Sequence, residues 1–415
     1  MVLLLTGVSQ GDALANIARA FKPEFEAAGY HFAEVSLAIP QAAGPALGEL
    51  LAGGNIAFSF SFMGVAMPLE FSDDTGARAN LWARAGVPHI GIYGDSPAYY
   101  FDRHVTPGAH CATIYGFPEH AALRQRLPEI HGPIGTISPL LLDTISPESV
   151  DFTRKSTGKL LFLKNGNDPE ALRRTWHTEL RPAPLRVLEE LASVLTADLD
   201  SPALHQIDDL VLRYAADTGL DIARLPKLRL FFIAQLDDYT RRLKSTLITR
   251  ALLDLPVEIH GTGWEHVDFT GRRAQWIPVC DYAHSREMMR ECLGLLDMSP
   301  NTSLAPHDRV ARAFASHTLC ITNAQAFLTS SVPDAREVSF NFQPESIREV
   351  AARVLAHPAH HVELGAQVAQ KFSAAHPPGR AIGYLIAQAE MLRLNMRPDR
   401  PPGLPDYFIW PPKSL

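Results

Sequence analysis

The stretch from Leu296 to Arg309, Leu-Asp-Met-Ser-Pro-Asn-Thr-Ser-Leu-Ala-Pro-His-Asp-Arg, carries the strongest indication of the fold. It begins in an apolar run, continues as a polar loop and enters a segment whose apolar residues recur at helical spacing. The pattern predicts a strand over Gly294–Met298 and a helix that starts near Pro306 or His307. A strand that leads through a short loop into a helix is the repeating unit of parallel α/β sheets. Ligands bind at the carboxyl ends of such strands.

The same alternation of short apolar runs and helical patterns extends through both halves of the chain. Strands are predicted over Val2–Thr6, Glu34–Leu37, Ile56–Ser61, His89–Tyr93, Ala112–Tyr115, Leu160–Leu163, Val257–His260, Gln275–Pro278, Leu319–Thr322 and Glu337–Phe340. Helices are expected over Asp12–Ala28 and Gly379–Arg393, and a long helical insertion covers about 169–253. The rhythm predicts two Rossmann-like α/β domains.

Domain bounds follow from a break in this rhythm. Residues 132–158 are rich in Gly, Pro, Ser and Thr and show little periodicity, as expected of a linker. We therefore expect an N-terminal domain over 1–150 and a C-terminal domain over 158–390. The tail, 391–415, is apolar enough around Tyr407–Trp410 to pack back on the body.

Length and composition agree with two globular domains. The chain has 415 residues, of which 46% are hydrophobic and 20% charged, and its formal net charge is −7. An acidic balance disfavours nucleic acid as a partner. No apolar window is long enough for a transmembrane helix, and peripheral contact with a membrane stays open. The short apolar start and four cysteines without a CxxC pair, expected to be buried and reduced, point to a cytoplasmic protein.

The loop within the opening stretch has the chemistry of an anion site. Asn301, Thr302 and Ser303 offer neutral donors, the following helix presents free N–H groups at its start, and Arg309 adds a fixed cation. These features suit a diphosphate. A capped surface helix with a solvated arginine would show the same pattern, and the residues alone leave both readings open.

A second loop, His260-Gly261-Thr262-Gly263-Trp264-Glu265, directly follows a predicted strand. Its glycines would let the backbone approach a phosphate or a base closely, and Trp264 would either stack on a ligand or pack in the core. A simple strand-ending turn is the alternative. The chain has neither a full GxGxxG nor a P-loop, which counts against the usual nicotinamide and ATP sites.

Together these motifs resemble the C-terminal domain of the spore-maturation-type (CgeB-like) glycosyltransferases, a GT-B-fold branch near the family 4 glycosyltransferases. The resemblance covers about 160–390 and is looser in the N-terminal half. The matching elements are Gly261–Trp264, Pro278, Tyr282, Ser299-Pro300-Asn301, Asp308-Arg309, Leu319–Asn323, the loop Leu161–Asn167 and the N-terminal segment Gly91–Pro97.

The resemblance implies a glycosyltransferase that moves a sugar from a nucleotide-diphosphate-sugar donor to a saccharide, glycolipid or protein acceptor in surface-glycan synthesis. It implies no bound metal and no cofactor, since the nucleotide-sugar is a substrate. The donor would contact Gly261, Gly263, Trp264, Tyr282, Asn301, Thr302, Ser303, His307, Asp308 and Arg309. The resemblance also implies that the two domains face each other across a cleft, which Asn165, Asn167 and Tyr99 would line.

One departure from the family pattern concerns the donor ribose. Many relatives have a Glu three residues after the Arg, and this chain has Arg312 there. His317 also replaces the glycine expected near the end of that helix. The ribose contact is therefore in doubt.

Catalytic candidates lie at predicted strand ends in the N-terminal half. Asp95 follows the strand His89–Tyr93, and Asp12 follows the Gly-rich turn after the first strand. Either carboxylate could act as the base of an inverting transfer, or cap a turn or helix instead. His104 and His110, two of 17 histidines, are expected at the surface.

Two other functions remain open. A nucleotide-sugar epimerase or hydrolase would need acid and base carboxylates on both sides of the sugar, and the sequence shows no convincing pair. A non-catalytic partner with the same fold would keep the binding surfaces without turnover, as Arg312 in place of Glu suggests.

Overall fold

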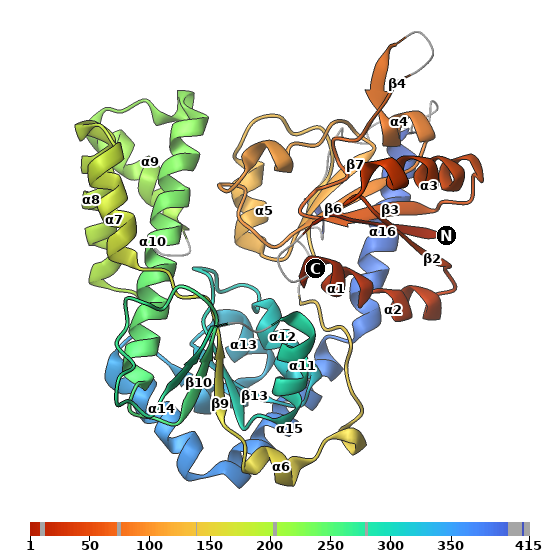
Figure 1. Ribbon diagram of the computed structural model, residues 1–415. Coiled ribbons are helices and arrows are strands. Elements are labelled where there is room, and N and C mark those ends of the chain that lie inside the picture. Colours follow the sequence, from red (N-terminus) through yellow and green to blue (C-terminus); the bar gives the residue numbers. More distant parts are fainter. Residues whose placement is uncertain are drawn as a thin grey trace. The chain divides into compact units, whose positions relative to one another are not determined.

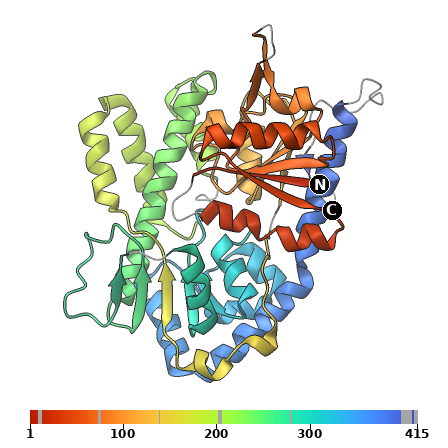
Figure 2. The same cartoon turned by 45° about the vertical axis from the view of Figure 1, so that its right-hand side comes forward.

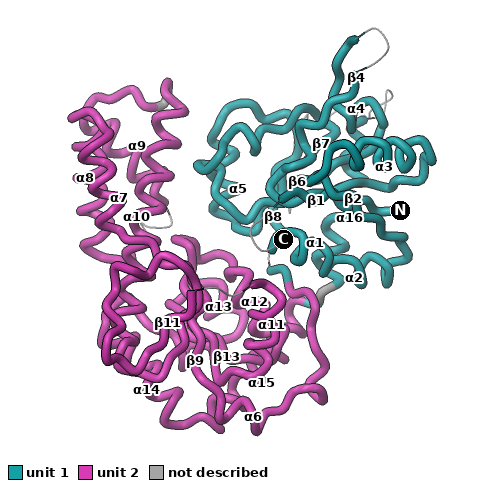
Figure 3. The backbone as a smooth tube through the Cα atoms, viewed as in Figure 1, with its two compact units in different colours: residues 1–140, 377–415 teal, residues 141–376 magenta. Residues whose placement is uncertain are grey.

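The computed structural model describes residues 1–8, 13–72, 76–137, 139–201, 206–278, 281–396 and 409–410. The chain divides into two compact units (Figure 3). Unit 1 contains residues 1–140 and 377–415, and unit 2 contains residues 141–376.

Unit 1 is built on a seven-stranded parallel sheet with the order β15-β8-β7-β6-β3-β1-β2 (Figure 1). Its strands are β1 (Val2–Thr6), β2 (Phe32–Ser36), β3 (Phe58–Phe62), β6 (His89–Tyr93), β7 (Cys111–Tyr115), β8 (Ile134–Thr136) and β15 (Ile409–Trp410). Its helices are α1 (Ala13–Arg19), α2 (Lys22–Ala27), α3 (Pro40–Ala52), α4 (Leu81–Ala85), α5 (Pro118–Gln125) and α16 (Pro378–Met396), and an antiparallel hairpin joins β4 (Glu70–Ser72) to β5 (Arg78–Asn80).

Strand β3 shows why this sheet forms from this sequence. Its residues alternate Phe-Ser-Phe-Ser-Phe, so the phenylalanines share one face and the serines the other. The phenylalanine face packs against Phe21 and Phe25 beside and within α2. On the other face, Ser59 Oγ and Ser61 Oγ lie 2.8 Å and 3.0 Å from the two ring nitrogens of His89. Both faces are therefore buried and satisfied.

Unit 2 contains a six-stranded parallel sheet with the order β11-β10-β9-β12-β13-β14. Its strands are β9 (Leu160–Leu163), β10 (Val257–His260), β11 (Gln275–Ile277), β12 (Gly294–Asp297), β13 (Leu319–Asn323) and β14 (Ser339–Phe340). The covering helices are α6 (Phe152–Ser156), α11 (Tyr282–Glu291), α12 (Asp308–Ala315), α13 (Ala326–Ser331), α14 (Pro344–Ala356) and α15 (Pro358–Ala375), with a 3₁₀ helix η6 (Pro333–Val338) before β14.

The predicted helical insertion is present as four α-helices between β9 and β10, which stand together in both views (Figures 1 and 2). They are α7 (Pro169–Glu179), α8 (Pro182–Ala197), α9 (Ile207–Thr218) and α10 (Pro226–Leu252). The long helix α10 packs against the other three and also against α14 beside the sheet. A buried ion pair, Arg229 Nη2 to Asp208 Oδ2 at 2.6 Å, ties α10 to α9. Side chains of α10 thus reach the sheet of unit 2.

The division between the units differs from the predicted bounds. It falls at 140/141 instead of within 150–158, because residues that follow Leu140 are bonded to unit 2. Ile145 N donates to Ala315 O at 3.0 Å, and the ring Nε2 of His317 lies 3.0 Å from Ile145 O. The last helix, α16, belongs to unit 1, where Arg393 Nη2 donates to Ala57 O at 2.6 Å.

The predicted strands are all present, with ends shifted by two residues at most. The single helix expected over Asp12–Ala28 is wrong, since α1 ends at Arg19 and α2 starts at Lys22. Pro23 explains the break, because it lacks an N–H and is tolerated in the first turn of a new helix. Cys111, Cys292 and Cys320 are buried free thiols as expected, and Cys280 lies outside the described residues.

Candidate functional site

The carboxyl ends of β9 and β12 bring together charged side chains from four parts of unit 2. Lys164 follows β9 directly, and Asp297 is the last residue of β12, which pairs with β9 in parallel. The helix α12 begins at Asp308 after the polar loop, as predicted, and carries Arg309 in its first turn. Side chains of α10 complete the group, which we call the cation cluster: Lys164, Arg241 and Arg309 with Asp237 and Asp297.

Arg309 is held by a buried carboxylate. Its Nε donates to Asp297 Oδ1 at 2.8 Å, the Asp297 side chain is completely buried and that of Arg309 is 18% exposed. A guanidinium has five N–H donors, and this is the one that is bonded to another side chain in the described part of the chain. Asp297 therefore fixes the guanidinium while leaving donors for an anion.

The helix α10 adds Arg241 and Asp237, which are one helical turn apart with Arg241 Nη1 3.5 Å from Asp237 Oδ2. Asp237 also accepts a hydrogen bond from Asn301. The Asn301 Nδ2 atom donates to Asp237 Oδ1 at 2.9 Å and to Thr240 Oγ1 at 2.7 Å. Asn301 is buried and has a positive φ of 51°, a conformation that asparagine tolerates. The buried side chain of Asn301 thus joins the loop to α10 through these hydrogen bonds.

The cluster lowers the pKa of Lys164 to about 7. Burial is the largest cause, and the positive charges of Arg241 and Arg309 act in the same direction. Asp297 and Asp237 oppose the shift without cancelling it. A lysine in this state takes up a proton readily when a negative charge arrives.

Several buried polar atoms around the cluster have no partner in the described structure. They are Asp297 Oδ2, Asn301 Oδ1 and Thr302 Oγ1. Buried polar atoms are normally hydrogen-bonded, and unsatisfied ones gather where a ligand or ordered water belongs. The loop 299–303 therefore has more hydrogen-bonding capacity than the protein itself uses.

The two loops that follow β9 and β10 pack on each other. Gly166 N donates to Thr262 O at 2.8 Å, and Asn165 Oδ1 accepts from Thr262 N at 3.1 Å. Gly261 and Gly263 have φ values of 146° and 80°. A Cβ at Gly263 would lie 1.9 Å from Gly166 O. These glycines are thus required by the contact between the loops, whatever they contribute to a ligand.

Trp264 packs in the core of unit 2. Its side chain is fully buried and its Nε1 donates to Lys164 O at 2.9 Å. Of the two roles left open by the sequence, the structure shows packing. Trp264 therefore positions the backbone of Lys164 instead of stacking on a ligand. Asn167, on the same loop, is exposed.

The side chain of His307 caps the start of α12, directly after the polar loop. His307 Nδ1 accepts from Arg309 N at 3.3 Å and lies 2.7 Å from an oxygen of Asp308. Ser303 is partly buried, and its carbonyl accepts from Phe327 N at 3.0 Å. His307 thus caps the start of α12, and Ser303 joins the loop to α13.

Arg312 occupies the position where the resemblance leads one to expect a ribose-binding carboxylate. Its guanidinium carbon lies 3.9 Å from the ring centroid of Tyr282, and its Nη2 donates to Ser285 Oγ. Both partners lie in α11. The arginine and Tyr282 thus form a link between α11 and α12, and burial raises the pKa of Tyr282.

Unit 1 holds the catalytic candidates of the N-terminal half. Asp95 is exposed in the turn after β6, where Tyr99 N donates to Ser96 O at 2.9 Å. Tyr99 is partly buried. Asp12 lies outside the described residues, so its expected role is not addressed by the structure.

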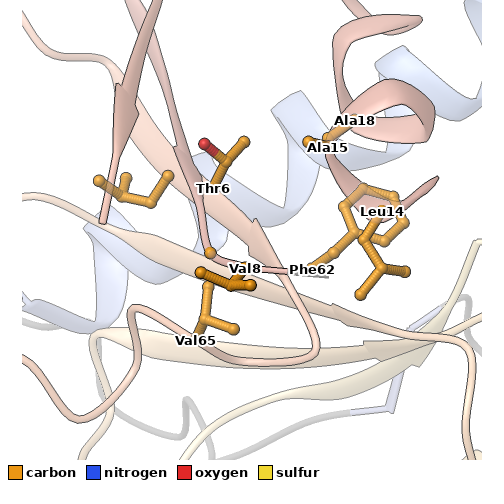
Figure 4. A pocket seen from close by; sticks show the side chains of 9 residues that line it. Thr6, Val8, Leu14, Ala15, Ala18, Phe62 and Val65 are labelled. Carbon is orange, nitrogen blue, oxygen red and sulfur yellow. The ribbon is translucent and has the colours of Figure 1, made fainter. Parts of the chain in front are cut away.

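An apolar pocket opens at the carboxyl ends of β1 and β3 (Figure 4). Its interior volume is about 20 Å³, which is room for little more than one water molecule. The pocket is therefore too small for a sugar. The lining residues are Leu5, Thr6, Gly7, Val8, Leu14, Ala15, Ala18, Phe62 and Val65.

The expectation that His104 and His110 lie at the surface is wrong. His104 is completely buried and His110 is 9% exposed. His104 stacks on both Tyr93 and Tyr115, and its Nδ1 lies 2.8 Å from the Tyr115 hydroxyl. His110 Nε2 lies 2.8 Å from Asn80 Oδ1, so both buried histidines have a polar partner within unit 1.

Residues 241–387 match the model of a family described as glycosyl transferase-like, which is about a third of the chain and includes most of the cation cluster. No curated protein matches. Two of the solved structures with a similar chain course are the DNA-modifying enzyme β-glucosyltransferase, studied with and without uridine diphosphoglucose, and MurG of Acinetobacter baumannii.

The β-glucosyltransferase is 10% identical, with 94% of this chain and 100% of that chain covered and a TM-score of 0.41. MurG is 9% identical, with 94% and 99% covered and a TM-score of 0.34. A UGT transferase from Siraitia grosvenorii in complex with UDP is 9% identical, with 94% and 100% covered and a TM-score of 0.40. Likenesses this distant carry no argument about the activity of this chain.

Among the described residues, no helix combines the length and apolar character that crossing a membrane requires.

Proposed function

We propose that unit 2 binds the diphosphate of a nucleotide-sugar at the cation cluster and that the chain transfers the sugar to an acceptor. The observation that carries the proposal is the meeting of Lys164, Arg241 and Arg309 at the carboxyl ends of β9 and β12. A diphosphate has several anionic oxygens, and arginine forks together with a lysine ammonium suit them. The glycosyl transferase-like match over 241–387 supports the same reaction class.

The chemistry follows from where negative charge develops. As the bond between sugar and diphosphate breaks, charge grows on the leaving phosphate oxygen. Fixed cations and the start of α12 would stabilise this charge without reorganising, which is the main source of rate acceleration in such sites. In this proposal, Lys164, Arg241 and Arg309 bind the diphosphate directly and the transfer is metal-independent.

The acceptor belongs to unit 1 in this proposal. Asp95 is exposed at the carboxyl end of β6 and would take the proton of the acceptor hydroxyl. The acceptor would be a saccharide, a glycolipid or a protein. The expected cellular setting is the synthesis of surface glycans in the cytoplasm.

The donor site is tested by a thermal-shift screen of the full chain with UDP, GDP, CDP, dTDP and CMP. A ligand at 100 times its Kd should add about 2.7 kcal/mol to the free energy of unfolding. One diphosphate should stabilise the protein, and Lys164→Met should reduce this stabilisation. Lys159 is the matched control, because it lies at the opposite end of the same strand and is 53% exposed in a surface pair with Glu258.

The role of Asp95 is tested separately. Asp95→Asn should lower the rate of sugar transfer by about 10²- to 10⁴-fold, the usual contribution of a general base, while nucleotide binding stays unchanged. Equal rates for Asp95→Asn and the unmodified protein would remove Asp95 from the reaction.

A non-catalytic binding partner is the second candidate, and one observation favours it. Arg312 is committed to Tyr282 and Ser285 at the position where relatives hold the ribose with a carboxylate. A protein of this kind would bind a nucleotide or glycan without turnover. Nucleotide binding combined with neither sugar transfer nor donor hydrolysis, over a panel of acceptors, would favour this candidate.

A further inference from the structure

Two adjacent histidines and a glutamate converge in unit 2 outside the cation cluster. His360 and His361 lie in the first turns of α15, and Glu337 lies in η6. One ligand atom of each residue lies within 4.8 Å of those of the other two. His360 Nε2 is 2.7 Å from Glu337 Oε1, and His361 Nε2 is 3.6 Å from the same oxygen.

The orientation of His361 is fixed by the backbone. Its Nδ1 lies 2.8 Å from His357 O, and because a carbonyl oxygen only accepts, the ring carries its proton on Nδ1. The Nε2 atom is then a bare acceptor. Metal-binding histidines are held in this way, with the second nitrogen donating to a carbonyl or carboxylate.

His361 Nε2 is buried, unpartnered and directed at a negative group. The side chain is 1% exposed, and Nε2 has no hydrogen-bond partner in the described structure. It faces the Glu337 carboxylate, so two acceptors confront each other unless a cation lies between them.

We propose that Glu337, His360 and His361 bind a divalent transition-metal ion of the zinc type. Zinc bonds to imidazole nitrogen and carboxylate oxygen at about 2.0–2.2 Å, so tetrahedral ligand atoms lie about 3.3 Å apart. The 3.6 Å between His361 Nε2 and Glu337 Oε1 is close to that spacing, whereas the 2.7 Å between His360 Nε2 and Glu337 Oε1 is a hydrogen bond that the ion would replace. His360 and Glu337 are 58% and 41% exposed, which leaves room for water as a further ligand.

The ion would join η6 to the start of α15. Arg353 Nη2 already donates to Glu337 O at 2.6 Å, so the end of η6 is held in place before an ion binds. The helix α15 packs closely on β13, since a Cβ at Gly365 would lie 2.7 Å from Leu319 N. A metal at this point would therefore stabilise unit 2 without taking part in sugar transfer.

No metal site is expected from the sequence, because adjacent histidines do not match the helical spacing of i and i+4. Glu337 and the two histidines come together only in the folded chain, because β14 and α14 separate η6 from α15 in the sequence and the chain turns back between them. The proposal concerns a site apart from the diphosphate, for which the expectation of metal-independence stands.

The experiment is a zinc titration of the metal-free full chain by calorimetry, repeated with cobalt to record the visible absorption of the bound ion. His360→Gln and Glu337→Gln alter exposed ligands and leave buried His361 in place. Loss of a residue that only hydrogen-bonds to a metal ligand weakens metal affinity by about 10- to 100-fold, so loss of a ligand should weaken it at least as much. His177→Gln is the matched control, because His177 is 57% exposed and its Nε2 lies 3.1 Å from Glu189 without a second histidine.

The expected result is uptake of about one zinc ion, with affinity lost in both ligand variants, kept in the control, and reduced as acid protonates the imidazoles. The cobalt complex should lose its absorption in the same two variants. The proposal is overturned if the intact chain takes up no zinc at micromolar concentration. It is also overturned if either ligand variant binds zinc as the intact chain does. Nucleotide binding is measured in parallel and should not change, so the outcome is separate from that of the donor site.

Discussion

Lys164 makes the proposed donor site sensitive to pH in a way that can be worked out in advance. In the empty protein its pKa is lowered to about 7, first by burial and then by Arg241 and Arg309. A phosphate oxygen about 4 Å from the ammonium, at an effective dielectric constant near 20, would contribute about 4 kcal/mol, or about three pKa units. The pKa of Lys164 in the complex should therefore return to about 10.

Two measurable quantities follow from this difference. At about pH 8 the empty site is about one-tenth protonated and the bound site almost fully so, hence binding should take up about 0.9 proton. Between about pH 7.5 and pH 8.5 the Kd of the nucleotide diphosphate should rise about eight-fold, because the protonated form that binds well becomes scarcer. The second pKa of a phosphate group is about 6, so the nucleotide itself does not titrate in this window.

The assay is isothermal titration calorimetry of the full chain with the stabilising nucleotide, in pairs of buffers with different ionisation enthalpies. The buffer dependence of the heat gives the number of protons taken up. Lys164→Met should bind more weakly and lose the pH dependence, whereas Lys159→Met should keep it. A Kd that changes less than two-fold across the window, or a proton uptake near zero, would refute the assignment of Lys164 to the anion site.

Two further predictions concern stability. Burial lowers the pKa of His89 and of His104 to about 3 each, below the unfolded value of about 6.5. Their contribution to the free energy of unfolding is therefore complete above about pH 6.5 and falls with acid, by about 2 kcal/mol per histidine at about pH 5. Urea unfolding above about pH 6.5 and at about pH 5 measures this loss of stability. His89→Gln, which keeps polar contacts, should remove about half of the loss. Gly263→Ala should destabilise unit 2 by more than the roughly 1 kcal/mol cost of a positive φ alone, because its Cβ would lie 1.9 Å from Gly166 O. Gly219→Ala is the control, with φ of 72° and nothing within 4 Å, and equal losses in the two variants would contradict the predicted clash.

The elements of the fold could be predicted because their sequence periods are strong. The bounds of β6, β9 and β10 agree residue by residue with the apolar runs, and α12 starts where the loop chemistry indicates. Pro23 indicates the interruption between α1 and α2. The helical spacing of apolar residues on either side of Pro23 nevertheless favours one continuous helix. Short strands such as β8, with three residues, carry too little pattern to be recognised.

The candidate site was predictable only in part. Arg309 and Asn301 could be found because they lie in one loop next to a helix start. Arg241 could not, since α10 reaches the cluster only after the insertion has folded against the sheet, and its position has no local signature. Lys164 does have a signal in the sequence, because it directly follows a predicted strand in the loop that carries Asn165.

Buried groups were the least predictable, because burial depends on contacts between distant segments. His104 looks like a loop residue in the sequence, yet it is enclosed by Tyr93 and Tyr115, which come from two separate strands. Trp264 shows the converse. A Gly-x-Gly-Trp pattern after a strand suggests an exposed stacking surface, and the tryptophan instead fills the space against Gly166.

The charges of the cation cluster explain why a single lysine should control binding. The two arginines, Arg241 and Arg309, are balanced by the two carboxylates of Asp237 and Asp297, so the formal sum of these four groups is zero. The carboxylates keep the guanidinium groups in place while the site is empty, and they also repel an arriving diphosphate. Only protonation of Lys164 gives the cluster a net positive charge. Since burial sets the pKa of Lys164 near neutrality, the cost of an unpaired buried charge in the empty site is avoided, and the charge appears when the ligand that needs it binds.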